Sequence, residues 1–325
     1  MSQANMPQAP ERLPNEPYYN QPDPQASQRR RWGRLLLGVG LVWLAFTIVG
    51  NGPWFAGFPF APGRTIDHDI AGSSLLITTQ SDDITLERSA DREFHIQATV
   101  RGWGWGGSPD DVLRRAGVEI RSDDGAVRVT APRRSFQLGN FGVEIHVAVP
   151  QGAPVTVETV SGDVKASELD GVLAITTTSG DVQLGETIGA LTVTTNSGDV
   201  QLRDGRATDA TVKTNSGDVD LRGVAGQTAV TTQSGDIAVR DAADATLDLQ
   251  SVSGDVRFDG MLASSGVNAL KTVSGDLDVR VGNQSLDITH ATSGDVDIEV
   301  AQQPVSALKL QLTTSSGDIQ VKPLD

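Results

Sequence analysis

The sequence predicts an all-β fold, a parallel β-solenoid (β-helix) built from repeats of about 18–19 residues and preceded by one transmembrane helix. Three observations predict it. The triplet Ser-Gly-Asp occurs nine times between residues 161 and 318, at spacings of 18 to 23 residues. Apolar and polar residues alternate on both sides of each triplet, as in strands with one buried face. A charge-free apolar run of about 20 residues precedes the repeats.

The first 65 residues divide into three predicted segments. Residues 1–31 are rich in Pro, Gln and Asn, a composition that cannot bury a core, so we expect a disordered cytoplasmic tail. Residues 32–54 are long enough, at about 1.5 Å per residue, to cross a bilayer as a helix. Residues 55–65, which combine Pro, Gly and Phe, form a predicted linker.

The arginines before the apolar run predict its orientation. Arg29, Arg30 and Arg31 precede the helix, and the positive-inside rule places them in the cytoplasm. The C-terminal domain is then periplasmic or extracellular, and the lipid bilayer is the expected partner of residues 32–54. Two alternatives stay open. One is a cleaved signal peptide, although no Ala-x-Ala-like site follows the run; the other is a buried core helix.

Residues 151–325 are predicted to form the Ser-Gly-Asp repeat solenoid, with two strands in each repeat. Val, Ile or Leu stands three residues after every triplet serine. Four residues before that serine stands an apolar residue or Thr289, and two residues before it stands Thr, Ser251 or Ala291. One such repeat cannot bury its apolar stripe alone. We therefore expect like strands to stack in parallel, about 4.8 Å apart, with Val on Val and Thr on Thr.

Residues 66–150 show a looser form of the same pattern and form the predicted N-terminal β-rich part of the solenoid domain. Ser81, followed by Asp82 in place of Gly, is expected to open a degenerate capping coil. A short helix is predicted near residues 109–116. Further strands are expected at 94–100, 118–121, 126–130 and 143–149.

The triplet is the first candidate site, and its structural interpretation is a tight turn. In this interpretation glycine supplies a positive φ, and the Ser and Asp side chains bond to nearby backbone N–H groups. The turn glycines are Gly162, Gly180, Gly198, Gly217, Gly235, Gly254, Gly275, Gly294 and Gly317.

A functional interpretation of the same triplet is a stacked carboxylate ladder that binds Ca²⁺. Neighbouring exposed charges about 4.8 Å apart repel by only about 0.9 kcal/mol in water, so the ladder does not require a metal. Its members would be Asp163, Asp181, Asp199, Asp218, Asp236, Asp255, Asp276, Asp295 and Asp318.

These repeats resemble a family of bacterial envelope proteins called "putative adhesins", a domain of unknown function with Ser-Gly-Asp-Val β-strand repeats. The resemblance covers about Ile66 to Val321, and the nine triplets with their Val or Ile and Thr positions carry it. It implies a β-solenoid exposed beyond the membrane, in some members linked with envelope-stress systems. It implies no catalytic residue and no cofactor. A fold alone does not assign a function.

Composition and the remaining motifs exclude several classes of site. The chain has no cysteine, which excludes disulfides, a thiol nucleophile and cysteine-ligated zinc. Its net charge of −15 predicts no nucleic-acid partner. Residues 102–107 match G-x-G-x-x-G, but no alternation of strand and helix follows. Asp67, His68 and Asp69 could lend metal ligands, but the histidines, His68, His95, His146 and His290, are scattered singly, as surface or satisfied residues are.

The function expected from these observations is a non-enzymatic, membrane-anchored protein of the cell envelope. Its solenoid would serve as an adhesin-like or scaffold surface for an unknown protein or glycan. The binding residues would be the outward ones, which alternate with the stacked Val and Thr residues. Three alternatives stay open: an envelope-stress sensing ectodomain, a β-helix polysaccharide-active enzyme, and a cytoskeletal β-helix polymer of the bactofilin kind. Residues 151–325 contain no Trp or Tyr and only Phe258, which argues against a ring-stacking sugar site.

Overall fold

The computed structural model describes residues 64–101, 117–131 and 142–324. The predicted tail and transmembrane helix, residues 55–63 of the predicted linker, the helix near 109–116 and the glycine-rich loop 102–107 lie outside these ranges. The last two linker residues, 64 and 65, belong to a strand instead. Within them the chain forms 24 strands joined by turns, and no helix there is long and apolar enough to cross a membrane. The all-β fold is therefore confirmed for the part that the structure describes.

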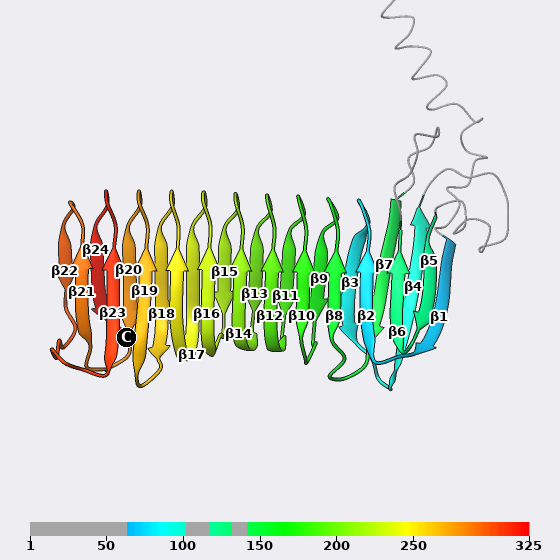
Figure 1. Ribbon diagram of the computed structural model, residues 1–325, viewed down its shortest axis with the longest axis horizontal. Helices are drawn as coiled ribbons and strands as arrows, with labels where there is room; N and C mark the ends of the chain where they lie inside the picture. The colour runs from blue at the N-terminus through cyan, green and yellow to red at the C-terminus, as the bar shows by residue number, and fades with distance from the viewer. Residues whose placement is uncertain (1–63, 102–116, 132–141, 325) are drawn as a thin grey trace, which may run out of the picture. The chain divides into compact units, whose positions relative to one another are not determined.

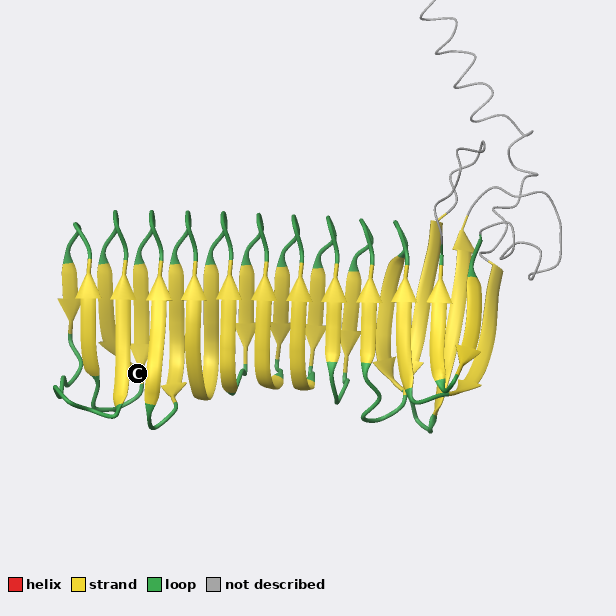
Figure 2. Cartoon of the chain, in the orientation of Figure 1, coloured by secondary structure: helices red, strands yellow, loops and turns green. Residues whose placement is uncertain are grey.

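The repeats form a flattened solenoid, in which each coil is two strands connected by the triplet (Figures 1 and 2). We name each coil by its triplet serine. The strands before the triplets form one broad face, the lead-in sheet, and those after the triplets form the other, the lead-out sheet. The lead-in strands are β8 (Val155–Glu158), β10 (Leu173–Thr176), β12 (Ile188–Thr194), β14 (Arg206–Lys213), β16 (Gly226–Thr231), the second half of β17 (Ile237–Gln250), β19 (Gly266–Lys271), β21 (Asp287–Ala291) and β23 (Leu308–Thr313). The lead-out strands are β9 (Val164–Ser167), β11 (Val182–Gly185), β13 (Val200–Arg203), β15 (Val219–Arg222), the first half of β17, β18 (Val256–Leu262), β20 (Leu277–Val281), β22 (Val296–Ile298) and β24 (Ile319–Pro323).

Like strands stack in parallel and in register, as predicted. In the lead-in sheet Val157 lies opposite Ile175, which lies opposite Val193. In the lead-out sheet Val182 lies opposite Val164 and Val200. These side chains are at most 1% exposed and fill the space between the two sheets. β-Branched residues suit such a surface because their restricted side chains pack well on a pleated sheet.

The threonines two residues before the triplets also stack inside the coil. Thr272 and Thr314 each donate a hydrogen bond to a glycine carbonyl of the preceding coil, and Ser251 does the same. Thr79 and Thr159 bond to each other at 3.0 Å. In these three coils the hydroxyl connects the buried core to the backbone of the turns, whereas the buried hydroxyls of Thr177, Thr195, Thr214 and Thr232 have no hydrogen-bond partner in the part of the chain that the structure describes.

The Ser81 coil forms as predicted, but it does not end the solenoid. Its strands β2 (Ser74–Thr78) and β3 (Asp83–Arg88) pair with the Ser161 coil on one side and with β6 (Ala126–Thr130) and β7 (Gly142–Val149) on the other. Beyond them, β1 (Arg64–Ala71), β4 (Glu93–Arg101) and β5 (Glu119–Asp123) add antiparallel strands. This end is capped because the antiparallel strands break the coil pattern.

The coils at the C-terminal end do not stack in sequence order. The last coil of the sequence, β23 and β24, lies between the Ser274 coil and the Ser293 coil. In Figure 1 the red strands β23 and β24 accordingly lie inside the orange β21 and β22. In sequence order the chain therefore forms the terminal Ser293 coil first. Residues 299–307 then lead back to the last coil, which lies between the Ser293 and Ser274 coils.

The terminal coil also has a different register from the one its sequence predicted. His290 lies opposite the buried Leu312, and Ile288 lies opposite Leu310. The assignment of Thr289 and Ala291 to the inward positions is therefore wrong. The reason is a turn one residue shorter, in which Thr292 takes the inward place and donates to the carbonyl of Gly317 at 2.6 Å.

Candidate functional site

The triplet glycines are required by close stacking of the turns. A Cβ added to Gly180 would overlap the carbonyl oxygen of Gly162, and the same clash recurs at each triplet glycine along the stack. Gly162, Gly180, Gly198 and Gly217 do not have a φ in the left-handed region. Gly294 does not either, whereas Gly235, Gly254, Gly275 and Gly317 have φ between 152° and 158°. The predicted positive φ is therefore confirmed for these last four and wrong for the other five, and the requirement that all nine share is the space between coils.

The triplet aspartates form a continuous hydrogen-bonded ladder along this edge. The backbone N–H of Asp236 donates to Oδ1 of Asp218 at 2.9 Å, and Asp255 donates to Asp236 in the same way. Nine such bonds of 2.8 to 3.3 Å follow the spatial order of the coils: Asp163 to Asp83, Asp181 to Asp163, Asp199 to Asp181, Asp218 to Asp199, Asp236 to Asp218, Asp255 to Asp236, Asp276 to Asp255, Asp318 to Asp276 and Asp295 to Asp318. One carboxylate oxygen of each acceptor thus has a structural role.

Metal binding at this edge stays a prediction. In the described ranges no three or more His, Cys, Asp or Glu side chains converge on a point that could hold a metal ion. The ladder carboxylates are exposed, and they lie in a line along the stack. Asp67 and Asp69 lie on one side of β1 and His68 on the other, so these three do not converge either.

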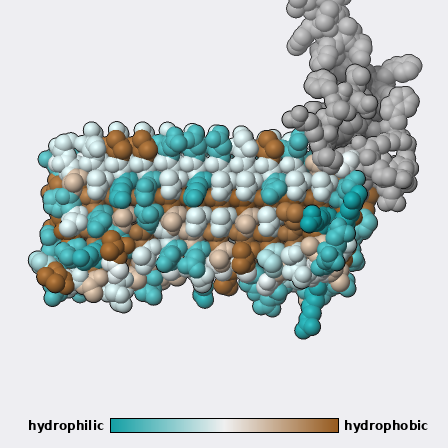
Figure 3. Space-filling model, viewed as in Figure 1, coloured by the Kyte–Doolittle hydropathy of each residue, from teal (hydrophilic) through white to brown (hydrophobic). Residues whose placement is uncertain are grey.

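The lead-out sheet carries a set of cations that the sequence analysis did not single out. Because coils stack in register, outward side chains align in rows across the coils, and rows of this kind are visible on the face drawn in Figure 3. Arg222 lies opposite Arg240, and Arg280 lies opposite Lys322. Six neighbouring coils each contribute one basic side chain, a set that we call the basic row: Arg203, Arg222, Arg240, Arg257, Arg280 and Lys322. Five of them share one register position; in the Ser253 coil Asp259 holds that position, and Arg257 stands two residues before it.

Two aspartates orient four members of the basic row. Asp220 accepts two bonds from Arg240 Nη1, at 2.7 and 2.8 Å, and lies 3.8 Å from Arg222 Nε. Each aspartate lies between two guanidinium groups and leaves one net positive charge.

Asp278, three coils further on, has a similar arrangement. Its Oδ2 lies 3.2 Å from Arg257 Nε and 3.8 Å from Arg280 Nη2. The side chains of Arg257 and Arg280 remain 49% and 50% exposed, so their outer N–H groups face solvent.

Amides hold the two ends of the basic row. Arg203 donates to Gln201 at 3.1 Å, and Lys322 donates to Gln320 at 3.3 Å. In these six coils the outward positions hold six cations against Asp220, Asp259 and Asp278, which gives 6 − 3 = +3. The same coils of the lead-in sheet hold Arg206, Lys213, Lys271 and Lys309 against Asp209 and Asp248, which gives 4 − 2 = +2, and these charges do not form one row.

The basic row lies between the aspartate ladder and, in two of its six coils, an aspartate that follows the row. The triplet aspartates border it on one side. On the other side Asp204 and Asp241 directly follow Arg203 and Arg240, in left-handed turns with φ of 52° and 53°. The sequence contained a usable signal, since Arg or Lys stands six residues after the triplet serine in five of these six coils. The net charge of −15 is summed over the whole chain and therefore gave no indication of this local basic surface.

A groove runs between the aspartate ladder and the middle of the basic row. It has a volume of about 370 Å³ and opens where Ala238 interrupts the row of larger side chains. Its lining includes Asp218, Asp236, Arg240 and Arg257. A wider depression of about 920 Å³ lies at the capped end, beside Arg88 and Asp91.

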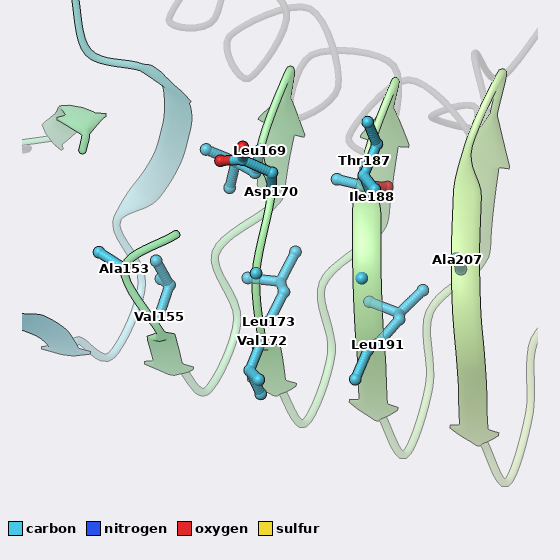
Figure 4. Close-up of a pocket in the computed structure, with 13 residues that line it drawn as sticks. Ala153, Val155, Leu169, Asp170, Val172, Leu173, Thr187, Ile188, Leu191 and Ala207 are labelled. Atoms are coloured by element: carbon cyan, nitrogen blue, oxygen red, sulfur yellow. The ribbon is translucent and has the colours of Figure 1, made fainter. Parts of the chain in front are cut away.

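An apolar notch lies at the edge opposite the triplets (Figure 4). Leu169, Leu173 and Leu191 line it, and Val172 and Ile188, which are 54% and 47% exposed, border it. Its cavity of about 10 Å³ has room for about one water molecule. The notch is therefore too small to hold a ligand.

His95 forms a charged cluster on the capped end. Its Nδ1 lies 2.6 Å from Asp69 Oδ1 and its Nε2 lies 3.0 Å from Asp91 Oδ1, so both nitrogens have a carboxylate partner. The hydrogen bond with Asp69, supported by Asp91, raises the pKa of His95. The backbone N–H of Glu93, which donates to Asp91 at 2.8 Å, lowers the pKa of Asp91. His146 lies 3.6 Å from Glu87 on the same sheet.

Comparison with known proteins identifies relatives of the repeat region. A family model described as Toastrack DUF4097 matches residues 73–285. A solved "putative adhesin" from Bacteroides fragilis is 15% identical with a TM-score of 0.41, and the match covers 80% of this chain and 97% of that chain. A "putative lipid binding protein" from Parabacteroides distasonis is 11% identical with a TM-score of 0.38, covering 82% and 98%. A comparison with curated proteins finds no match.

Proposed function

The chain belongs to the Toastrack DUF4097 family, and from that membership and the surfaces described above we propose that it is a non-enzymatic, membrane-anchored protein of the cell envelope. Its solenoid presents the lead-out sheet as an adhesin-like or scaffolding interaction surface. The family match confirms the resemblance carried by the triplets. The single observation that carries the proposed function is the basic row, an ordered and exposed set of cations on an otherwise acidic chain.

The shape of the solenoid supports an interaction surface more than a catalytic one. Phe94 and Phe258 are the aromatic residues in the described ranges, and both are fully buried. Sugar-cleaving sites stack rings on exposed aromatics, so no observation on the described surface favours the polysaccharide-active alternative. The exposed polar rows suit a partner that lies along the coils.

Topology is the first test of this proposal, and the absence of cysteine makes it direct. We would introduce Ser27→Cys in the tail or Thr231→Cys on the exposed lead-in sheet and treat intact spheroplasts with a membrane-impermeant maleimide. The proposal expects Thr231→Cys to react in intact spheroplasts and Ser27→Cys to react only after lysis. If Thr231→Cys also needs lysis, the solenoid is cytoplasmic and the proposed function is wrong.

Adhesion and envelope-stress sensing differ in which segment finds the partner. An adhesin binds through the solenoid and keeps that binding when a different membrane anchor replaces residues 1–65. A sensor loses its signalling response in the same exchange, because a membrane neighbour engages the tail or helix. Whole-cell binding and stress-reporter activity of the exchanged chain distinguish the two.

A further inference from the structure

We propose that the basic row binds a linear anionic glycan of the cell envelope, whose carboxylate or phosphate groups lie one after another along the coils. This inference rests on the proposed function, since it names the partner of the lead-out sheet. The first observation that supports it is the spacing of the cations. The six cations occupy consecutive coils, and the coils are about 4.8 Å apart, so the row extends for about 24 Å, with Arg257 set two residues to one side of the other five. A repeating row of charges fits a polymer with repeating charges.

Arginine side chains of the basic row are oriented by aspartates before any ligand binds. Asp220 accepts hydrogen bonds from Arg240, and Asp278 accepts one from Arg257. Each aspartate also lies 3.8 Å from a second guanidinium group, that of Arg222 or Arg280. A guanidinium presents five donors in a planar fork, which matches the two oxygens of a carboxylate or phosphate. Because these side chains are already ordered, binding an anion costs less side-chain entropy than it would with free arginines.

The width of the basic row selects a narrow partner. The aspartate ladder borders it on one side, and Asp204 and Asp241 border it on the other. A broad anionic surface, such as a bilayer or duplex DNA, would bring its charge against both acidic edges as well as the row. A single polymer chain lying along the row avoids them.

The absence of exposed rings on the described surface decides against single-stranded nucleic acid. Proteins that bind single strands without sequence preference stack the bases on aromatic side chains. Phe94 and Phe258 are both buried. Recognition on this face therefore depends on charge and hydrogen bonds, which a carboxylated or phosphorylated glycan supplies.

The stacking order of the last coils completes the row. Lys322 lies beside Arg280 because the final coil is inserted beneath the terminal one. Stacking in sequence order would instead put Asp297 and Glu299 of the Ser293 coil next to Arg280. The inserted coil thus adds a cation and moves two acids to the end of the solenoid.

The test uses the full-length chain in detergent and measures its affinity for immobilised polymers at low salt. The probes are polygalacturonate as the carboxylate polymer, a glycerol-phosphate polymer as the phosphate source, and neutral dextran. Vesicles containing phosphatidylglycerol and a single-stranded oligonucleotide are the two competing classes. We expect one or both anionic glycan-type polymers to bind more tightly than dextran, vesicles or oligonucleotide, and the affinity to fall as salt screens the charges.

Two matched double variants separate the basic row from general charge. Arg222→Gln with Arg280→Gln removes two exposed cations of the row. Lys213→Gln with Lys271→Gln removes two exposed cations of the lead-in sheet. We expect the row variant to weaken polymer binding about tenfold or more, as loss of charged hydrogen bonds does, and the control to change it less than about twofold.

Three outcomes would overturn the inference: no binding of either anionic polymer at low salt, equal weakening by both double variants, or tighter binding of vesicles or oligonucleotide. Unfolding curves of both variants show whether a loss of binding reflects a loss of fold. The maleimide experiment is independent of these measurements. A cytoplasmic solenoid would refute the proposed function even if the purified chain binds the polymers.

Discussion

The backbone N–H of Asp318 donates to Oδ1 of Asp276 at 2.8 Å, although 42 residues separate the two in sequence. The intervening Ser293 coil lies outside them, and Asp295 in turn donates to Asp318. The aspartate ladder therefore follows the order of the coils in space rather than in sequence. It also shows that each junction between coils is formed by the same set of groups, whichever coils meet there.

Coil order can be tested by disulfide formation, since the chain has no cysteine of its own. Lys271 lies directly opposite Thr313, and Thr313 lies opposite Ala291. Neighbouring strands are about 4.8 Å apart, within the range of a disulfide, whereas the next strand but one is about twice as far. Lys271→Cys with Thr313→Cys should form a disulfide on mild oxidation. Lys271→Cys with Ala291→Cys should not, and the reverse result would mean that the coils stack in sequence order.

Close stacking predicts that Gly198→Ala destabilises the solenoid. The added Cβ would overlap the carbonyl oxygen of Gly180, and separating the coils to admit it should cost about 1–3 kcal/mol or more. Gly185→Ala is the control, because its Cβ would meet Ser167 only at 3.9 Å. Urea unfolding should show a clear loss for Gly198→Ala and a change within about 0.5 kcal/mol for Gly185→Ala. Equal stability of the two variants would show that the coils can admit a Cβ at Gly198 without cost.

The aspartate ladder predicts a small stability cost for losing one acceptor. Asp218→Ala leaves the backbone N–H of Asp236 without its partner and should reduce the free energy of unfolding by about 0.5–1.5 kcal/mol. Asp218→Asn keeps an acceptor oxygen and should retain most of that stability. Chemical unfolding of both variants measures this. A loss in the asparagine variant as large as in the alanine variant would mean that charge, not the hydrogen bond, matters at this position.

The structural role of the ladder also predicts its response to calcium. The Oδ1 of each acceptor in the ladder is already used by a backbone N–H, and in the described ranges no three His, Cys, Asp or Glu side chains converge on a point that could hold a metal ion. We therefore expect the melting temperature to stay unchanged on chelation and on addition of millimolar Ca²⁺. Thermal unfolding with chelator, Ca²⁺ and Mg²⁺ measures this. A rise in the melting temperature with Ca²⁺ alone, abolished by Asp218→Asn, would instead establish the calcium ladder.

His95 predicts a defined pH dependence of stability. Its pKa is raised above 6.5 by Asp69 and Asp91, so its contribution is fully present below about 6.5 and is lost as pH rises through the raised value. The contribution of Asp91 to stability changes with pH in the opposite direction. Because the pKa of Asp91 is lowered, its contribution is present above 3.8 and is lost as pH falls below 3.8. Compared with His95→Gln, the natural chain should be more stable at about pH 6 than at about pH 9.

Unfolding curves across that pH range test the histidine prediction. His68→Gln is the control, since His68 lies on the other side of β1 and should leave the difference unchanged. A stability difference between the natural chain and His95→Gln that does not vary with pH would show that the cluster acts through packing alone.

Sequence periodicity was sufficient to predict the coil, its two strands and its buried rows. Val, Ile and Thr recur at fixed distances from each triplet, and a period of 18 to 23 residues has one compact solution, in which like positions stack. The strand at Ala126–Thr130 was predicted at its observed bounds for the same reason. The glycine and aspartate positions were predicted too, although a positive φ explains only four of the nine glycines, and the close approach of the neighbouring coil, which requires all nine, could not be derived from one repeat.

Only the tertiary structure decided which coils are neighbours. Every coil offers nearly the same interface, so the repeat pattern cannot distinguish Ser293 from Ser316 as the partner of Ser274. The structure selects Ser316, and the one-residue shorter turn at Thr292 leaves the irregular coil at the end. That choice places Lys322 beside Arg280 and completes the basic row. The sequence by itself determined the repeating unit, because its periodicity is local; the row depended on packing between coils far apart in the chain.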